Sequence, residues 1–128
     1  MILIIYSDKF LQHQTGYMHP EQPERLTAIV DRLKTSTIAD KIKWIEPFSE
    51  RNAISAIEKV HSATYIDLVS AYSARGWGCF ESTQIFPNSF EVACLAVNAW
   101  LDGVDKVLAR HEPVFVLARP PGPDCTSR

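Results

Sequence analysis

The sequence of 128 residues lacks the cysteine pattern of a disulfide-stapled protein or of a cysteine-ligated zinc site. Its three cysteines are Cys79, Cys94 and Cys125. Their number is odd, and no two of them have the spacing of a Cys-x-x-Cys pair. We therefore expect no disulfide framework, and a reducing compartment, the cytoplasm, fits this cysteine usage best.

The sequence also lacks a basic block and a long apolar run. Its 13 Lys and Arg residues against 15 Asp and Glu residues give a net charge of −2, and no basic cluster stands out. The apolar residues 1–6 are too short to cross a membrane, and they have neither a basic flank nor a small-residue cleavage site. We therefore expect no nucleic-acid partner and no membrane association.

Three motifs of well-known chemistry are missing as well: a glycine-rich phosphate loop, a nucleophile elbow and a His-Glu-x-x-His metal motif. What is present is an ordinary globular composition, with 46% hydrophobic and 22% charged residues. This composition permits a packed core in one domain or in part of one.

Two aliphatic runs, residues 2–6 and 113–119, are typical of strands covered on both faces in a parallel sheet. Between them, apolar spacing predicts a short strand near residues 43–45. It also predicts helices over residues 23–35, 51–60, 63–73 and 88–109. Strand, helices, strand is the order of an α/β fold, and the chain has the crossover that parallel pairing of the two runs needs.

The connecting segments carry turn-forming residues. Residues 7–24 are predicted to form a long surface loop, and residues 75–87 are predicted to be irregular. Ser62 is a plausible N-cap, and Asn88 with Glu91 three residues later fits a capping box. The helix that follows Asn88 carries one apolar stripe. Its members are Phe90, Ala93, Cys94, Val97, Leu101, Val104 and Leu108.

Four histidines are candidates for chemistry. His13 and His19 share one loop, but their separation of six residues is no helical metal spacing, and no acidic partner is obvious. We expect them to form hydrogen bonds or to lie on the surface rather than to bind zinc. His61 at a helix start and His111 just past a helix end are expected to be structural, through capping or the helix dipole.

Four segments, taken together and in order, resemble the histone deacetylase superfamily. Residues 19–26, His-Pro-Glu-Gln-Pro-Glu-Arg-Leu, are similar to its His-Pro-Glu-x-Pro-x-Arg signature. Residues 60–66 are similar to its Val-His-x-x-x-Tyr-Ile segment, and residues 82–89 look like its substrate loop. Residues 114–122 look like the strand that ends in Arg-Pro-Pro-Gly. The resemblance covers residues 1–122, which we interpret as the N-terminal part of a deacetylase-like domain.

The resemblance implies a partial arginase-like, three-layer α/β fold with a parallel sheet. It implies zinc as the cofactor of the full-length family, held by two aspartates and a histidine, with an acetyl-lysine or acetylpolyamine substrate. In that family a His-His pair after Arg-Pro-Pro-Gly acts as general base, and a later tyrosine polarises the carbonyl. Zinc lowers the pKa of its bound water, and a nearby histidine accepts the proton.

The sequence departs from this pattern after Gly122. The family has His-His-Ala there, whereas this chain has Pro123, Asp124 and Cys125. We therefore expect residues 123–128 to be a non-matching tail, as after a frameshift, a premature stop or a sequencing error. The expected chain is truncated and inactive, with no catalytic residue and no metal ligand of its own. The alternative is a non-catalytic α/β protein that binds a partner or completes a split enzyme.

Four residues match positions that line the family's pocket. Arg25 matches an arginine beside the inner channel, or else it is a partly buried helix residue paired with Glu21 or Glu24. Ser82 matches a rim position that contacts the substrate amide, or else it is a plain loop serine.

His19 and Pro20 match the first rim loop of the family. Arg119 is expected to anchor the end of its strand by hydrogen bonds rather than to touch substrate. In α/β sheets ligands bind beyond the carboxyl ends of the strands, where the loops after Tyr6 and from Arg119 both lie.

Overall fold

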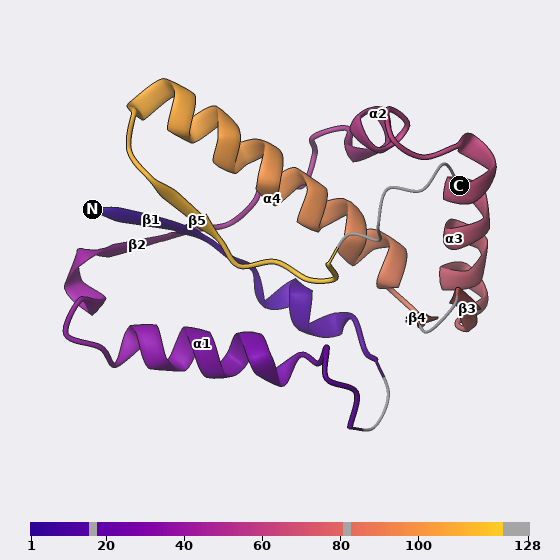
Figure 1. Cartoon of the computed structure of the whole chain (residues 1–128), viewed down its shortest axis with the longest axis horizontal. Coiled ribbons are helices and arrows are strands. Elements are labelled where there is room, and N and C mark those ends of the chain that lie inside the picture. Colours follow the sequence, from indigo (N-terminus) through magenta and orange to yellow (C-terminus); the bar gives the residue numbers. More distant parts are fainter. Residues whose placement is uncertain (16–17, 81–82, 122–128) are drawn as a thin grey trace.

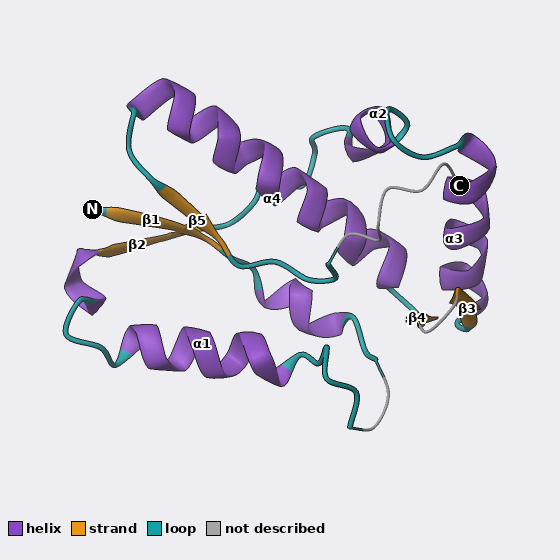
Figure 2. Ribbon diagram, viewed as in Figure 1, coloured by secondary structure: helices purple, strands orange, loops and turns teal. Residues whose placement is uncertain are grey.

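The computed structural model describes residues 1–15, 18–80 and 83–121. Along the chain the strands are β1 (Ile2–Ile5), β2 (Ile42–Ile45), β3 (Gly78–Phe80), β4 (Thr83–Ile85) and β5 (Val114–Val116). The α-helices are α1 (Glu24–Lys34), α2 (Ala53–Ile57), α3 (Ala63–Arg75) and α4 (Ser89–Arg110). Short 3-10 turns occupy Asp8–Gln12 and Ala39–Lys41. Figures 1 and 2 show a small sheet with α1 and α4 on opposite sides of it.

The main sheet has the strand order β2-β1-β5, and both pairings are parallel. Ile4 of β1 lies opposite Trp44 on one side and Phe115 on the other. Leu3, Ile4 and Ile5 are at most 2% exposed, as expected for a strand covered on both faces. The predicted α/β fold, with its two aliphatic runs in one parallel sheet, is confirmed.

Helix α1 covers one face of this sheet. Leu26 and Val30, four residues apart, are its buried side chains, and both belong to the core cluster that contains Ile4. Pro23 stands at the N-cap with a helical φ of −56°, which suits the fixed ring of proline. The predicted helix over residues 23–35 is therefore confirmed to within one residue at each end.

Helix α4 covers the opposite face, but not with the stripe that its spacing predicts. The side that faces the core consists of five buried residues: Val92, Leu95, Ala96, Ala99 and Gly103. The predicted stripe is instead half-buried at its start and exposed at its end, where Val104 and Leu108 are 55% and 68% exposed. The alanines and the glycine on the buried side allow close packing against the sheet, whereas the predicted apolar stripe lies on another side of the helix.

Two buried polar residues of α4 hold the segment before α2. Asp102 is 8% exposed, and its carboxylate accepts hydrogen bonds from the Phe48 amide (2.7 Å) and from the Arg51 guanidinium (2.8 Å). Asn98 is 3% exposed and donates to the Arg51 carbonyl (3.2 Å). Because buried polar groups need such partners, these two residues tie the connection between β2 and α2 to α4.

The start of α4 also differs from the predicted capping box. Asn88 has a φ of 70° and its side chain accepts no capping hydrogen bond. The Phe90 amide donates instead to the hydroxyl of Ser73 in α3 (3.1 Å), and the Phe86 amide donates to the hydroxyl of Ser89 (3.0 Å). A side chain from another helix has thus taken the place of the local cap. The other predicted cap is confirmed, because the Ser62 hydroxyl accepts from the Tyr65 amide (3.2 Å).

Residues 75–87, predicted to be irregular, contain an antiparallel hairpin in which β3 pairs with β4. Gly76 ends α3 with a φ of 92°, a left-handed conformation that glycine adopts without a steric penalty. Among the described helices, none is long and apolar enough to cross a membrane.

Candidate functional site

Arg119, just beyond the carboxyl end of β5, is the centre of a buried polar cluster. The residue is 3% exposed. Its Nε and one terminal nitrogen donate to the two carboxylate oxygens of Glu21, at 2.6 and 2.8 Å. The other terminal nitrogen donates to the backbone carbonyls of Phe10 (2.9 Å) and His13 (2.7 Å). We use the name Arg119 clamp for the Arg119 side chain together with the Glu21 carboxylate and the carbonyls of Phe10 and His13. These hydrogen bonds confirm the expected anchoring role of Arg119.

The clamp explains why the predicted surface loop, residues 7–24, turns part of its described side chains inward while others stay exposed. Phe10 is 0% exposed and His13 3% exposed, so the loop turns side chains inward. The hydroxyl of Ser7, itself buried, accepts from the Lys9 amide (3.2 Å) and caps the 3-10 turn. Two carbonyls that would otherwise be buried without partners bond to Arg119, which makes burial of the loop tolerable.

His13 lies beside the clamp and has a hydrogen-bonding role. Its Nδ1 lies 2.9 Å from the hydroxyl of Ser89 at the start of α4. Burial lowers the pKa of His13 below 6.5, and the positive charge of Arg119 lowers it further, while Glu21 opposes the shift. The Nε2 atom is 4.0 Å from a Glu21 oxygen that already accepts from Arg119, so a charged His13–Glu21 pair is not favoured. His13 therefore joins the loop after β1 to α4 as a neutral ring.

The lowered pKa of His13 makes stability depend on pH. Because the unfolded chain binds the proton more readily, neutral His13 contributes fully above the unfolded pKa of 6.5. This contribution is lost as the pH falls from 6.5 towards the folded pKa. We expect the free energy of unfolding to fall more steeply over this window than it does in a His13→Gln variant, measured by urea unfolding. Identical slopes in the two proteins would contradict the expectation.

The other rim candidates lie in the same loop. His19 is half-buried, and its Nδ1 accepts a hydrogen bond from the Glu21 amide (3.1 Å). Pro20 is exposed. The His-Pro-Glu motif is therefore a turn in which the histidine orients the backbone of the glutamate that Arg119 binds.

Arg25 is exposed on α1, and the structure does not pair it with Glu21, whose carboxylate bonds to Arg119 instead. The alternative of a partly buried Arg25 is thus wrong, and among the described residues Arg25 forms no ion pair with either expected partner, Glu21 or Glu24. A channel role for Arg25 stays a prediction. Ser82 lies outside the described residues, and its rim role also stays a prediction. The missed partner of Arg119 had one signal in the sequence, since Glu21 and Arg119 each lie within a recognised motif.

The described residues do not fit a zinc ion. Within residues 1–15, 18–80 and 83–121, no group of three or more His, Cys, Asp and Glu side chains could hold a metal. His13 Nε2 and a Glu21 carboxylate oxygen lie 4.0 Å apart, but hydrogen bonds to Ser89 and Arg119 already engage these two residues. The ligand set that the family resemblance implies is not among the described residues.

A hollow of about 630 Å³ lies between α2, α3, α4 and the residues that follow β5. Its walls are mostly apolar, and Ala118, Pro120 and Pro121 contribute to them beyond the carboxyl end of β5. His61 and Tyr65 also line it, with ring centroids 5.1 Å apart. Two motif segments that are far apart in the sequence, residues 60–66 and 114–121, therefore meet at one hollow.

Of the two remaining histidines, His111 is the C-cap of α4 with a φ of 55°, at the helix end expected of it. The structural role expected of His61 stays a prediction, because its ring lines the hollow and its buried Nδ1 has no hydrogen-bond partner among the described residues. Cys94, which lines the hollow, is a free cysteine. Burial, aided by Glu91, raises the pKa of its thiol, which disfavours the nucleophilic thiolate.

Comparison with known proteins supports the family resemblance that the four motif segments indicate. The chain is 46% identical over 124 residues to an uncharacterized protein of Synechocystis sp., and the match covers 95% of this chain and 41% of that protein. It is 34% identical over 111 residues to the human polyamine deacetylase HDAC10, covering 80% of this chain and 16% of that one. A probable deacetylase of Archaeoglobus fulgidus is 29% identical, with 93% of this chain and 33% of that protein covered.

Comparison with a solved structure supports the same resemblance. The crystal structure of the HDA15 HD domain superposes with a TM-score of 0.83 at 25% identity, covering 94% of this chain and 35% of that one. The chain thus spans less than half the length of each of these relatives. The sequence model of the histone deacetylase domain matches residues 19–127, most of the chain. This chain therefore belongs to the histone deacetylase family.

Proposed function

We propose that this chain supplies the scaffold and part of the rim of a zinc-dependent deacetylase site for acetyl-lysine or acetylpolyamine amides. The observation that carries the proposal is the Arg119 clamp. It joins the His-Pro-Glu motif to the Arg-Pro-Pro motif across 98 positions of sequence. Both motifs lie where the strands of an α/β sheet end and where such folds bind ligands.

The role that we propose for the clamp is to position the rim of the site. Arg119 holds the Glu21 carboxylate with a rigid, two-pronged contact, and this fixes the turn that carries His19 and Pro20. A rim built on such a turn can orient a substrate without a step of its own in the reaction. We assign no catalytic residue among the described residues.

Zinc, when bound, would supply a water of lowered pKa and polarise the amide carbonyl. Its ligands and the general base would come from the part of the domain that the relatives have and this chain does not match. We therefore propose that the chain alone does not hydrolyse acetyl amides. The relative named as a human polyamine deacetylase supports the acetylpolyamine class, and the cysteine usage supports the cytoplasm as the location.

The test compares the chain with a chimera. Purified chain, supplied with zinc, is expected to release no acetate from an acetyl-lysine peptide or an acetylated polyamine. A chimera that joins residues 1–121 to the unmatched part of the Synechocystis relative is expected to hydrolyse one of them and to lose activity with a chelator. Turnover by the chain alone, or a folded chimera that binds zinc without turnover, would overturn the proposal.

A further inference from the structure

Ser89, the first residue of α4, connects two loops that are far apart in the sequence. Its side chain is buried, and its hydroxyl accepts a hydrogen bond from the Phe86 amide (3.0 Å) in the β4–α4 connection, residues 86–88. The same hydroxyl lies 2.9 Å from Nδ1 of His13, 76 positions earlier, in the loop after β1. That loop carries the His-Pro-Glu turn, and the connection belongs to the expected substrate loop. One buried hydroxyl therefore joins two parts of the expected rim.

The hydroxyl of Ser89 has a hydrogen-bond partner on each side. A carboxylate oxygen of Glu21 lies 4.0 Å from Nε2 of the neutral His13 ring and favours the proton on that nitrogen. Nδ1 then accepts from the Ser89 hydroxyl, which in turn accepts from the Phe86 amide. Because buried polar groups without partners are costly, removing either neighbour would leave part of the hydrogen-bonding capacity of this hydroxyl unmet. The two loops are therefore held by one shared group and not by two independent contacts.

The series of hydrogen bonds continues from His13 into the Arg119 clamp. The His13 carbonyl accepts from Arg119 (2.7 Å), and Arg119 donates to the two carboxylate oxygens of Glu21 (2.6 and 2.8 Å). The Glu21 amide donates in turn to Nδ1 of His19 (3.1 Å). Connected hydrogen bonds thus lead from the β4–α4 connection to the His-Pro-Glu turn, and His13 is the residue that the clamp and Ser89 share.

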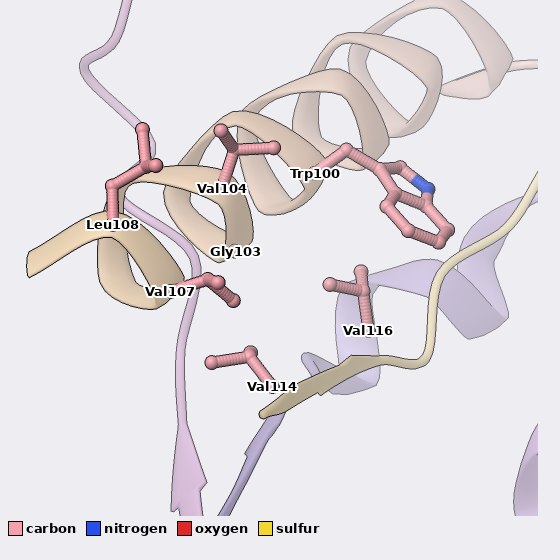
Figure 3. Close-up of a pocket in the computed structure, with 7 residues that line it drawn as sticks. All are labelled: Trp100, Gly103, Val104, Val107, Leu108, Val114 and Val116. Atoms are coloured by element: carbon pink, nitrogen blue, oxygen red, sulfur yellow. The ribbon is translucent and has the colours of Figure 1, made fainter. Parts of the chain in front are cut away.

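Helix α4 itself is fixed by other contacts. Val92 and Ala99 are 2% and 0% exposed in the core cluster. Further along, Gly103 lets the helix approach β5 closely, since a Cβ atom there would lie 2.9 Å from Cγ2 of Val116. Figure 3 shows Gly103 beside Val114 and Val116 of the strand. Loss of one hydroxyl at the start of α4 should therefore loosen the loops without moving the helix.

A purely local role at the start of α4 is the alternative, and Ser73 provides the control for it. Ser73 is as buried as Ser89, at 5% exposed. Its hydroxyl accepts from the Phe90 amide (3.1 Å) and donates to the Phe86 carbonyl (3.5 Å). Among the described residues, these hydrogen bonds reach α4 and the β4–α4 connection but not the loop after β1. Ser73 thus stabilises the same helix start without joining the two loops.

We propose that Ser89 and His13 are positioning residues that hold the β4–α4 connection and the His-Pro-Glu turn in one fixed arrangement at the rim. This inference rests on the proposed function, because only a completed deacetylase site gives the rim a substrate. It goes beyond that function by naming two residues that act on substrate binding through the loops that they join.

The first test measures hydrogen exchange of single amides in the chain alone and needs no substrate. In Ser89→Ala, the bonded amides of Phe10 and Glu21 should exchange about three- to tenfold faster, the size expected for one lost hydrogen bond. Ser73→Ala removes an equally buried hydroxyl and should leave both rates within about twofold of the original. Circular dichroism melting verifies that each variant folds.

The reverse change gives an independent readout at the other loop. His13→Ala should speed exchange at the Phe86 amide about three- to tenfold, because coupling between two sites is reciprocal. His13→Asn keeps a side-chain acceptor near the position of Nδ1 and should return this rate to within about twofold of the original.

The second test uses the chimera of residues 1–121 and the acetylated probe that it hydrolyses. Ser89→Ala should raise KM about three- to tenfold and change kcat less than about twofold, because a looser rim weakens binding of substrate and transition state equally. Ser73→Ala should leave KM within about twofold. An unchanged KM in the Ser89→Ala chimera, or a loss confined to kcat, would overturn the positioning role.

Two results in the chain alone would overturn the coupling itself. One is equal acceleration at the Phe10 and Glu21 amides in the two serine variants. The other is an unchanged rate at the Phe86 amide in His13→Ala. A chimera that hydrolyses neither probe would count against the proposed function alone, because exchange in the chain still decides whether the loops are coupled.

Discussion

Replacing Arg119 with alanine is expected to lower the free energy of unfolding by about 3–5 kcal/mol, the cost of breaking a buried ion pair from one side. The variant would leave the Glu21 carboxylate without its partner and the carbonyls of Phe10 and His13 without their donor. Domains of this size are stable by only about 5–15 kcal/mol, so the loss would be a large share of the total. Urea unfolding followed by circular dichroism measures it.

Two controls separate the clamp from a general effect of losing an arginine. Arg32→Ala removes an exposed arginine of α1 and should change stability by no more than about 0.5 kcal/mol. Glu21→Ala combined with Arg119→Ala should cost less than the sum of the single changes, since the two side chains form one contact. Additive losses, or equal effects of Arg119→Ala and Arg32→Ala, would mean that the clamp does not hold the loop.

Replacing Phe10 with alanine is expected to cost about 3–5 kcal/mol, as for other buried phenylalanines. Its side chain is fully buried in the core cluster, and its ring lies 6.4 Å from that of Tyr6. The truncation would leave a cavity between the loop and the sheet, and the same unfolding measurement reports the cost.

Gln12→Ala is the matched control for Phe10→Ala, because it changes an exposed residue of the same 3-10 turn. We expect it to alter stability by no more than about 0.5 kcal/mol. A loss below about 1 kcal/mol for Phe10→Ala would mean that the Phe10 side chain does not pack in the core.

The Arg119→Ala and Phe10→Ala variants test two features of the structure, and the sequence predicts only part of each. The anchoring role of Arg119 could be expected from its place at the end of a buried strand. Its carboxylate partner could not be derived from local patterns, because Glu21 lies 98 residues away, and the only signal was that both residues lie within motifs of the family. The same limit applies to the inward side chains of the loop, which its polar composition does not indicate and which depend on the bonds of its carbonyls to Arg119.

Helix α4 shows a second limit of sequence patterns. Apolar spacing located the helix correctly, but the stripe that it marks is not the side that packs against the sheet, because that side uses alanine and glycine together with Asn98 and Asp102. Those two polar residues are buried because distant backbone groups bond to them, a fact that periodicity does not contain. The cap of α4 likewise comes from Ser73 in another helix and not from the neighbouring Asn88 and Glu91.

The sequence alone determined the two aliphatic strands, their parallel pairing, the approximate helices and, through four motifs in order, the deacetylase resemblance. These features depend on residues close together in the chain, or on the order of segments, and both can be read directly. The tertiary structure alone decided which side of α4 is buried, that the loop after β1 turns inward, and that Glu21 and Arg119 join two motifs. These features depend on contacts between residues that lie far apart in the chain.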